Sequence, residues 1–147
     1  MTNLVLLVLA YFFMEFVAWF SHKYIMHGFM WSFHKDHHVK NLVFNSFFEK
    51  NDIFFLIYAT PAIILLIIGF ALDLSSLIAI GAGITLYGFT YFFIHDVIIH
   101  NRIPLRINFK NGYLTSLIKA HEAHHFGKNV KDFKIYGLLV FPARFLK

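Results

Sequence analysis

The sequence contains no cysteine among its 147 residues. Disulfide bonds, zinc sites with thiolate ligands and iron–sulfur clusters ligated by this chain are therefore excluded. Any metal ion that the chain binds must have nitrogen or oxygen ligands. Histidine is the first residue to examine for that role, because neutral imidazole is the commonest protein ligand for a transition metal.

Charged residues are also scarce: they make up 14% of the chain, whereas about 25% is usual in soluble domains. Hydrophobic residues make up 59% and aromatic residues 20%, which indicates a membrane protein. The thirteen lysines and arginines all lie within 23–50 and 102–147. The net charge of +5 does not indicate nucleic-acid binding, because the sequence has no basic run and no recognised nucleic-acid motif.

Three apolar stretches are long enough to cross a bilayer as helices, which takes roughly 20 residues. They comprise residues 3–21, 53–72 and 77–94. We interpret the first as a retained membrane helix, because a signal peptide would have a basic start and a cleavage site with small residues. Residues 113–126 form a further predicted helix, at the membrane surface.

Two features inside these stretches are candidates for special roles. Glu15 is an ionisable residue within the first stretch, and such residues are functional candidates; the alternative is a structural role with a buried partner. The third stretch contains glycines that suit close contact between membrane helices. These are Gly81, Gly83 and Gly88.

Three crossings place residues 22–52 and 95–147 on one side of the membrane. Because every lysine and arginine is on that side, the positive-inside rule makes it cytoplasmic and leaves the N-terminus outside. All ten histidines are on the same side. We therefore predict an all-α integral membrane protein in which residues 1–147 form a single domain.

The ten histidines form four motifs, in which H-x4-H followed by H-x2-H-H occurs twice. Unrelated histidines would not repeat an order in this way, so the pattern predicts metal binding. The first copy consists of His22, His27, His34, His37 and His38, and the second of His95, His100, His121, His124 and His125.

The spacing within each motif has geometric consequences. Residues of an α-helix turn by about 100° each, so the three histidines of each H-x2-H-H motif lie on one helix face. The two histidines of each H-x4-H motif would instead lie about 140° apart. We therefore expect each H-x4-H motif to lie where a membrane helix ends or is distorted.

Ten imidazoles are too many for one ion, since a zinc ion uses three or four protein ligands. Two five- or six-coordinate ions would use eight to ten. Imidazole suits iron, zinc, copper and nickel, and a pair of irons that activates O2 is the leading interpretation. Asp36, Asp96 and Glu122 could orient ligands through ring N–H groups, or could be solvated surface charges.

Two other function classes remain open at this point. Residues His121 to His125 match H-E-x-x-H, the zinc metalloprotease motif in which the glutamate is the base. That reading leaves the first copy of the histidine pattern without a role. A metal or haem carrier is the other alternative, although it would need ligands within the membrane spans or on both faces.

The residues between and around the histidines show a specific similarity. The gaps from His22 to His125 are 4, 6, 2, 0, 56, 4, 20, 2 and 0 residues. They are accompanied by HKYIMHG, by EKND at 49–52, by HDVIIHNRIP at 95–104, and by GYL and AHEAHH between 112 and 125. Over nearly its whole length, the chain resembles the bacterial β-carotene hydroxylases of the membrane fatty acid hydroxylase superfamily.

This resemblance implies a non-haem di-iron monooxygenase of the bacterial inner membrane. It implies hydroxylation of C3 of the β-ionone ring, from β-carotene through β-cryptoxanthin to zeaxanthin, with O2 as cosubstrate. All ten histidines would then be iron-site residues. Another lipid hydroxylation, desaturation or ketolation of the superfamily is the alternative.

The electrons for this reaction would come from a separate protein, because the sequence has no flavin or iron–sulfur motif. Ferredoxin and its reductase are the expected donor system. The basic C-terminal segment could dock an acidic partner, although its lysines equally suit anionic lipid headgroups.

Overall fold

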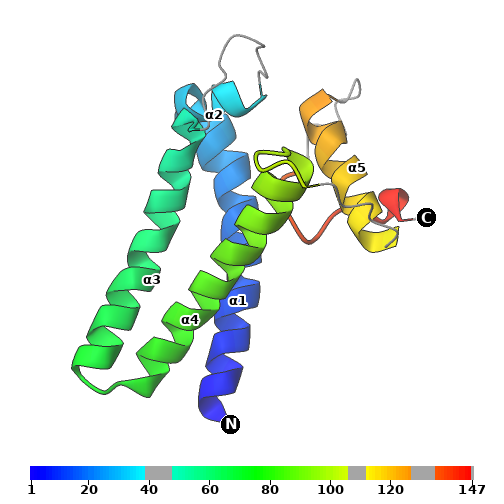
Figure 1. Ribbon diagram of the computed structural model, residues 1–147. Coiled ribbons are helices and arrows are strands. Elements are labelled where there is room, and N and C mark those ends of the chain that lie inside the picture. The colour runs from blue at the N-terminus through cyan, green and yellow to red at the C-terminus, as the bar shows by residue number, and fades with distance from the viewer. Residues whose placement is uncertain (39–47, 106–111, 127–134, 147) are drawn as a thin grey trace.

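The computed structural model describes residues 1–38, 48–105, 112–126 and 135–146, and all regular structure in these ranges is helical. The predicted all-α class is therefore confirmed. Three long helices form the body of the molecule (Figure 1): α1 (Thr2–Phe20), α3 (Ile53–Ala71) and α4 (Ser75–Tyr91). Within the described ranges, three helical units are long and apolar enough to cross a membrane, as predicted.

Helix α4 packs against both α1 and α3, and two of its glycines allow the close approach. A Cβ atom at Gly81 would lie 2.9 Å from Leu66 Cγ and 3.1 Å from Ala62 O. A Cβ atom at Gly83 would overlap the carbonyl oxygen of Leu7. The prediction is wrong for Gly88, because within the described residues no neighbouring element comes within 4 Å of a Cβ atom placed there.

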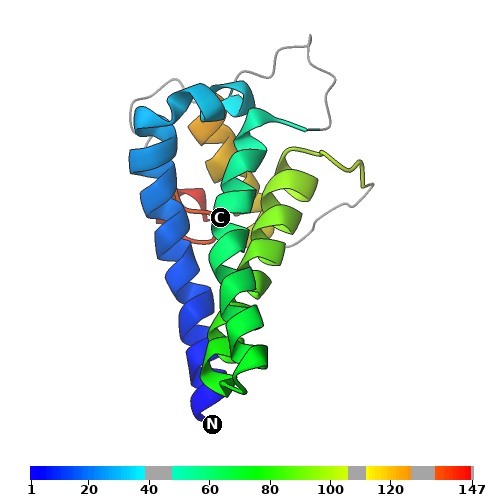
Figure 2. The same cartoon turned by 90° about the vertical axis from the view of Figure 1, so that its left-hand side faces the viewer.

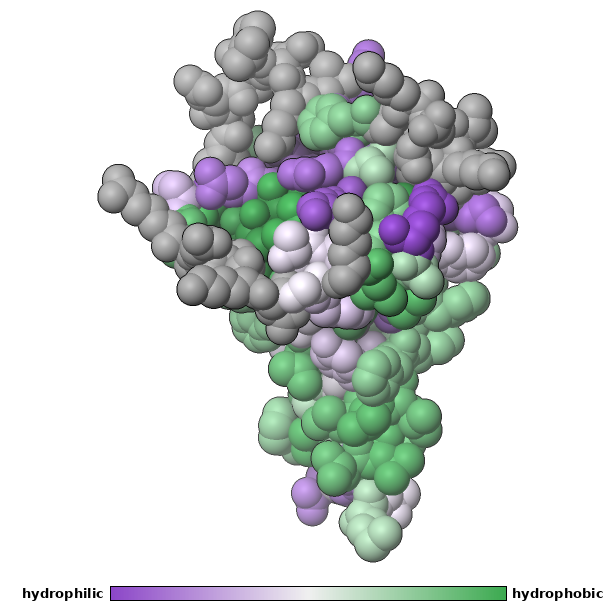
Figure 3. Space-filling model, turned by 90° about the vertical axis from the view of Figure 1, so that its right-hand side faces the viewer, coloured by the Kyte–Doolittle hydropathy of each residue, from purple (hydrophilic) through white to green (hydrophobic). Residues whose placement is uncertain are grey.

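The outer surfaces of the three helices are apolar and exposed. Phe13, Ile67 and Phe70 are 61%, 62% and 70% exposed, and a green hydrophobic band covers the narrow part of the molecule in Figure 3. Water would penalise so large an apolar surface, whereas lipid tails match it. These surfaces identify the part of the protein that lies in the hydrocarbon region of a membrane.

Aromatic and basic residues mark one boundary of that region. The ammonium group of Lys23 lies 4.9 Å from the ring centre of Trp19 and 4.7 Å from that of Tyr24. Tryptophan, tyrosine and snorkelling lysine are characteristic of the membrane interface. The interface on this side therefore lies near residues 19–24.

The polar end of the molecule is built from short helices that follow or precede the spans (Figure 1, Figure 2). Helix α2 lies above the end of α1, and α5 lies beside the end of α4, so segments far apart in sequence meet there. The helices are η1 (Ser21–Phe29), α2 (Trp31–His38), η2 (Lys50–Asp52), η3 (Phe92–Ile99), α5 (Gly112–Phe126) and η5 (Ala143–Phe145).

Glu15 joins the first span to the C-terminal part of the chain. It is only 8% exposed. One carboxylate oxygen accepts hydrogen bonds from the backbone amides of Leu139, at 2.9 Å, and Val140, at 3.0 Å. The other oxygen accepts one from the Tyr87 hydroxyl at 2.7 Å. Of the two roles considered for Glu15, the structural one is the role that these contacts describe.

Candidate metal centre

All ten histidines lie at the polar end of the molecule, although they come from four separate segments. Helix η1 carries His22 and His27, and η3 with the residue after it carries His95 and His100. The other six are on α2 and α5. The two copies of the sequence pattern, which are separated by two membrane spans, therefore meet in one cluster.

The H-x4-H motifs lie in π-helical turns, which explains their spacing. A π-helix is closed by hydrogen bonds between residues five apart, and the amide of His100 donates to the carbonyl of His95 at 3.0 Å. Residues five apart consequently share a face. The Nε2 atoms of His22 and His27 lie 3.2 Å apart. The predicted helix distortion is confirmed at both motifs.

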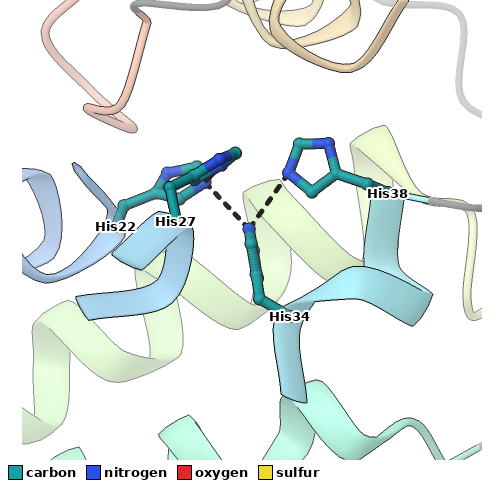
Figure 4. Close-up of side chains that lie close together, drawn as sticks. All are labelled: His22, His27, His34 and His38. Atoms are coloured by element: carbon teal, nitrogen blue, oxygen red, sulfur yellow. Dashed lines mark hydrogen bonds between the residues drawn. The ribbon is translucent and has the colours of Figure 1, made fainter. Parts of the chain in front are cut away.

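Four imidazoles converge in a first group, made of His22, His27, His34 and His38 (Figure 4). Each contributes one ring nitrogen, and these four atoms lie within 4.8 Å of one another. The Nε2 atom of His34 is 3.1 Å from those of both His22 and His38. Metal ligands around one ion must have this kind of convergent arrangement.

A second group consists of His37, His100, His121 and His125, whose ring nitrogens also lie within 4.8 Å of one another. The two remaining histidines each adjoin one group. His95 Nε2 is 3.2 Å from His37 Nε2, and His124 Nε2 is 3.1 Å from His27 Nε2 in the first group. The ten side chains therefore form two sets of five.

The middle histidine of each H-x2-H-H motif joins the set built mainly from the other copy of the pattern. His34 and His38 are one turn apart and belong to the first set, whereas His37 belongs to the second. On an α-helix His37 and His38 differ in direction by about 100°, so one helix can serve two neighbouring sites. His124 crosses in the opposite sense on α5.

Hydrogen bonds fix the ring tautomers in the first set. The Nδ1 atom of His22 donates to the carbonyl oxygen of Tyr136 at 3.0 Å, and Nδ1 of His34 donates to Asn51 Oδ1 at 2.7 Å. Burial lowers the pKa of His34 to about 4, so its ring is neutral at pH 7. With its proton on Nδ1, each ring presents an Nε2 lone pair, and these two lone pairs face each other.

The same arrangement recurs in the second set. The Nδ1 atoms of His37 and His95 face carboxylate oxygens of Glu49, at 3.2 Å, and Asp96, at 3.3 Å. Burial, followed by the neighbouring imidazoles, holds the pKa of His37 well below its usual value. The His37 contact is therefore a hydrogen bond from a neutral ring. The Nε2 atoms of His37 and His95 face each other, 3.2 Å apart.

Ring nitrogens that converge so closely repel one another unless a cation lies between them, so both sets fit a bound metal ion. The residues also provide the partners that metal-ligating histidines ordinarily have, since such a ring usually donates its other N–H to a carboxylate or carbonyl. An all-imidazole donor set suits iron, zinc, copper or nickel. The arrangement therefore indicates a two-metal centre without selecting the metal.

A guanidinium group links the carboxylates behind the second set. Arg102 Nη1 lies 2.8 Å from Asp52 Oδ1, and its Nη2 lies 3.4 Å from both Glu49 Oε2 and Asp96 Oδ1. Glu49 and Asp96, which face the Nδ1 atoms of His37 and His95, thus come from two chain segments and share the positive charge of Arg102. This network fixes the orientation of His37 and His95 from outside the centre.

The sequence-based candidates for this supporting role were partly right. Asp96 does contact a histidine ring, whereas Asp36 accepts a hydrogen bond from the backbone amide of Lys50 and Glu122 is exposed. Glu49 and Asn51 were missed as ring partners. Their signal was present, since both lie in the EKND stretch at 49–52 that accompanies the histidine pattern.

Comparison with known proteins supplies the family. The fatty acid hydroxylase family model matches residues 7–142. The chain belongs to the fatty acid hydroxylase family. No solved structure matches this chain.

Several members of this family with assigned names are similar over most of the chain. A β-carotene hydroxylase of Pantoea ananas is 38% identical over 129 residues, which are 88% of this chain and 71% of that protein. One from Paracoccus sp. (strain N81106 / MBIC 01143) is 37% identical, over 85% of this chain and 75% of that protein. A chloroplastic β-carotene 3-hydroxylase 2 of Arabidopsis thaliana is 37% identical, over 88% of this chain and 42% of that protein.

The geometry of this family member also bears on the zinc-protease alternative. In that reading His121 and His125 hold one zinc ion and Glu122 acts on its water. Here His121 and His125 converge with His37 and His100, while the Glu122 side chain is exposed to solvent. The H-E-x-x-H match therefore follows from the hydroxylase histidine pattern and does not describe a protease site.

Proposed function

We propose that this protein is a β-carotene 3-hydroxylase with a non-haem di-iron centre. The observation that carries the proposal is the pair of histidine sets, each built around four ring nitrogens that lie within 4.8 Å of one another. The family membership and the names of the relatives support the choice of reaction and substrate.

In the proposed reaction the C3–H bond of a β-ionone ring becomes C3–OH. One atom of O2 enters the product and the other leaves as water, with two electrons and two protons supplied from outside. β-Carotene is thereby converted through β-cryptoxanthin to zeaxanthin. The two irons would supply the activation of O2, which no side chain of the protein can perform.

The ten histidines divide naturally between the two irons. We assign His22, His27, His34, His38 and His124 to one iron, and His37, His95, His100, His121 and His125 to the other. Asn51, Glu49 and Asp96 would hold the ring N–H groups of three of these ligands. This outer support raises metal affinity by keeping each ring in its binding orientation and tautomer.

The surroundings proposed for the centre follow from the charge distribution. All lysines and arginines lie on the side of the histidines, so we place the centre at the cytoplasmic face of the bacterial inner membrane and the N-terminus outside. The substrate would come from the bilayer and the electrons from ferredoxin and its reductase. Six of the nine lysines and arginines of the C-terminal segment considered for docking, residues 102–147, lie outside the described residues.

The decisive experiment is expression in bacteria that accumulate β-carotene, followed by chromatography of the pigments and measurement of bound metal. We expect zeaxanthin and β-cryptoxanthin, and about two irons per chain. Unchanged β-carotene beside well-expressed, iron-loaded protein would refute the function. A keto product or a new double bond would instead support the other superfamily reactions.

A variant of Glu122 tests the competing chemistry in the same assay. Glu122→Gln is expected to keep hydroxylation within about twofold, because its side chain is exposed and away from the ring N–H partners. A zinc protease would lose its general base with this change. Proteolysis that depends on one zinc and on Glu122 would therefore overturn the oxygenase assignment.

A further inference from the structure

A pocket of about 550 Å³ lies between α1 and residues 135–142 of the C-terminal segment. Phe12, Phe16 and Trp19 line it from α1, and Val140 and Phe141 line it from the segment. Pockets of roughly 300–1,000 Å³ hold small-molecule ligands in proteins. The space is therefore large enough for a substituted six-membered ring and the first part of an attached chain.

The mouth of this pocket lies at membrane depth. Phe12 and Phe16 are 64% and 53% exposed, and both belong to the first span. Trp19 and Lys23, which mark the interface, lie further along the same helix. Lipid tails therefore surround the mouth, and a molecule that enters must be dissolved in the bilayer.

The interior of the pocket is suited to a hydrocarbon. Glu15 is the charged residue among its described lining residues, but both of its oxygens already accept hydrogen bonds. The donors are Tyr87, Leu139 and Val140. Three hydrogen bonds already occupy most of the acceptor positions of this carboxylate. Most of the other lining side chains, such as Phe12, Phe16 and Val140, are apolar.

Tyr136 belongs both to this pocket and to the metal centre. It lines the pocket, and its ring centre is 5.6, 5.4 and 5.4 Å from those of His22, His27 and His124. Its carbonyl oxygen also accepts the Nδ1 hydrogen of His22. One residue, Tyr136, thus contacts both the pocket and the first histidine set.

We propose that this pocket receives the terminal ring of the polyene substrate directly from the bilayer, with Tyr136 as its inner wall beside the first histidine set. The proposal rests on the proposed function and adds the route and the subsite that the substrate uses. The rest of the long polyene stays among the lipid tails outside the pocket. This arrangement lets a C40 hydrocarbon reach a metal centre at the membrane face without crossing water.

The absence of cysteine makes a direct test practicable, because an introduced cysteine is the sole thiol in the chain. Val140→Cys places a thiol in the pocket wall, and Phe13→Cys is a matched control that is exposed to lipid on α1 and does not line the pocket. Both proteins are reconstituted in nanodiscs with or without β-carotene. They are then labelled with benzyl methanethiosulfonate.

We expect β-carotene to slow labelling severalfold at position 140 and to leave the rate at position 13 unchanged. In the iron-loaded proteins, labelling should reduce β-carotene turnover at least tenfold for Val140→Cys relative to its own unlabelled sample. The labelled control should retain more than half of its turnover. Bound iron should be the same before and after labelling, which separates a blocked pocket from a damaged centre.

The absence of either effect at position 140, or an equal effect at position 13, would overturn the pocket proposal. Failure of the proposed function gives a different result, namely no β-carotene turnover by the wild-type protein. Protection from labelling requires that β-carotene binds but does not require turnover. In that case, labelling therefore still decides whether the pocket holds a polyene.

Discussion

Replacing Glu15 by alanine tests how the first span holds the C-terminal segment against the metal centre. The substitution removes one hydrogen bond to the buried Tyr87 hydroxyl and two to the amides of Leu139 and Val140. Leaving the Tyr87 hydroxyl without an acceptor costs about 1–3 kcal/mol. We expect a total loss of about 2–5 kcal/mol.

Part of this loss should be visible locally. The amides of Leu139 and Val140 should exchange their hydrogens faster in Glu15→Ala, by roughly 30-fold for each 2 kcal/mol of local stabilisation that is removed. Tyr136 is held by the same segment and orients His22 through its carbonyl. We therefore also expect metal affinity to fall, by about 10- to 100-fold, as for loss of other groups that orient ligands.

Hydrogen exchange measured by mass spectrometry on the protein in nanodiscs provides the assay, with metal titration on the same samples. Glu15→Gln is the conservative variant: it keeps the side-chain size and one oxygen for the two amides, so it should lose only about 1 kcal/mol. Tyr87→Phe is the matched control, since it leaves in place the two hydrogen bonds that Glu15 accepts from the amides of Leu139 and Val140. Unchanged exchange at Leu139 and Val140 in folded Glu15→Ala would refute the anchoring role.

Three further predictions concern packing, ligand orientation and the division of the histidines. Gly83→Ala should destabilise the protein by about 1–3 kcal/mol through overlap with α1, whereas Gly88→Ala should be neutral or stabilising; equal melting temperatures would contradict this packing. Asn51→Leu should lower metal affinity about 10- to 100-fold in a metal titration, and an unchanged affinity would deny it a role in orienting His34. The losses of metal-binding free energy in His37→Ala and His38→Ala should add in the double variant. A departure from additivity well above about 0.5 kcal/mol would place both histidines on one ion.

The positions of the three long helices were predictable because they depend on local composition. The long apolar runs are properties of consecutive residues, and α1, α3 and α4 agree with the predicted spans within three residues at each end. The repeated histidine order also predicted a two-metal site and a distortion at each H-x4-H motif. Only Gly88 among the predicted packing glycines was misassigned, because the sequence does not show which face of a helix has a neighbour.

The partners of individual side chains were not predictable in the same way. Glu15 could have been catalytic or structural until the C-terminal segment was seen to supply two amides to it. The sequence showed Asn51 and Glu49 only as part of the EKND stretch that resembles the hydroxylases, without a role for either residue. Their contacts with His34 and His37 depend on how η2 packs beside α2. Such contacts join segments that the sequence alone does not orient.

By itself, then, the sequence determined that this is a helical membrane protein, and it predicted a nitrogen-ligated metal centre on one side of the bilayer. Helical periodicity and hydrophobicity are local properties, so they can be read along the chain. Only the tertiary structure decided that His37 and His124 each join the set of the opposite half. That exchange arises because α2 and α5 meet across the ends of α1 and α4, where each helix presents side chains to two sites at once.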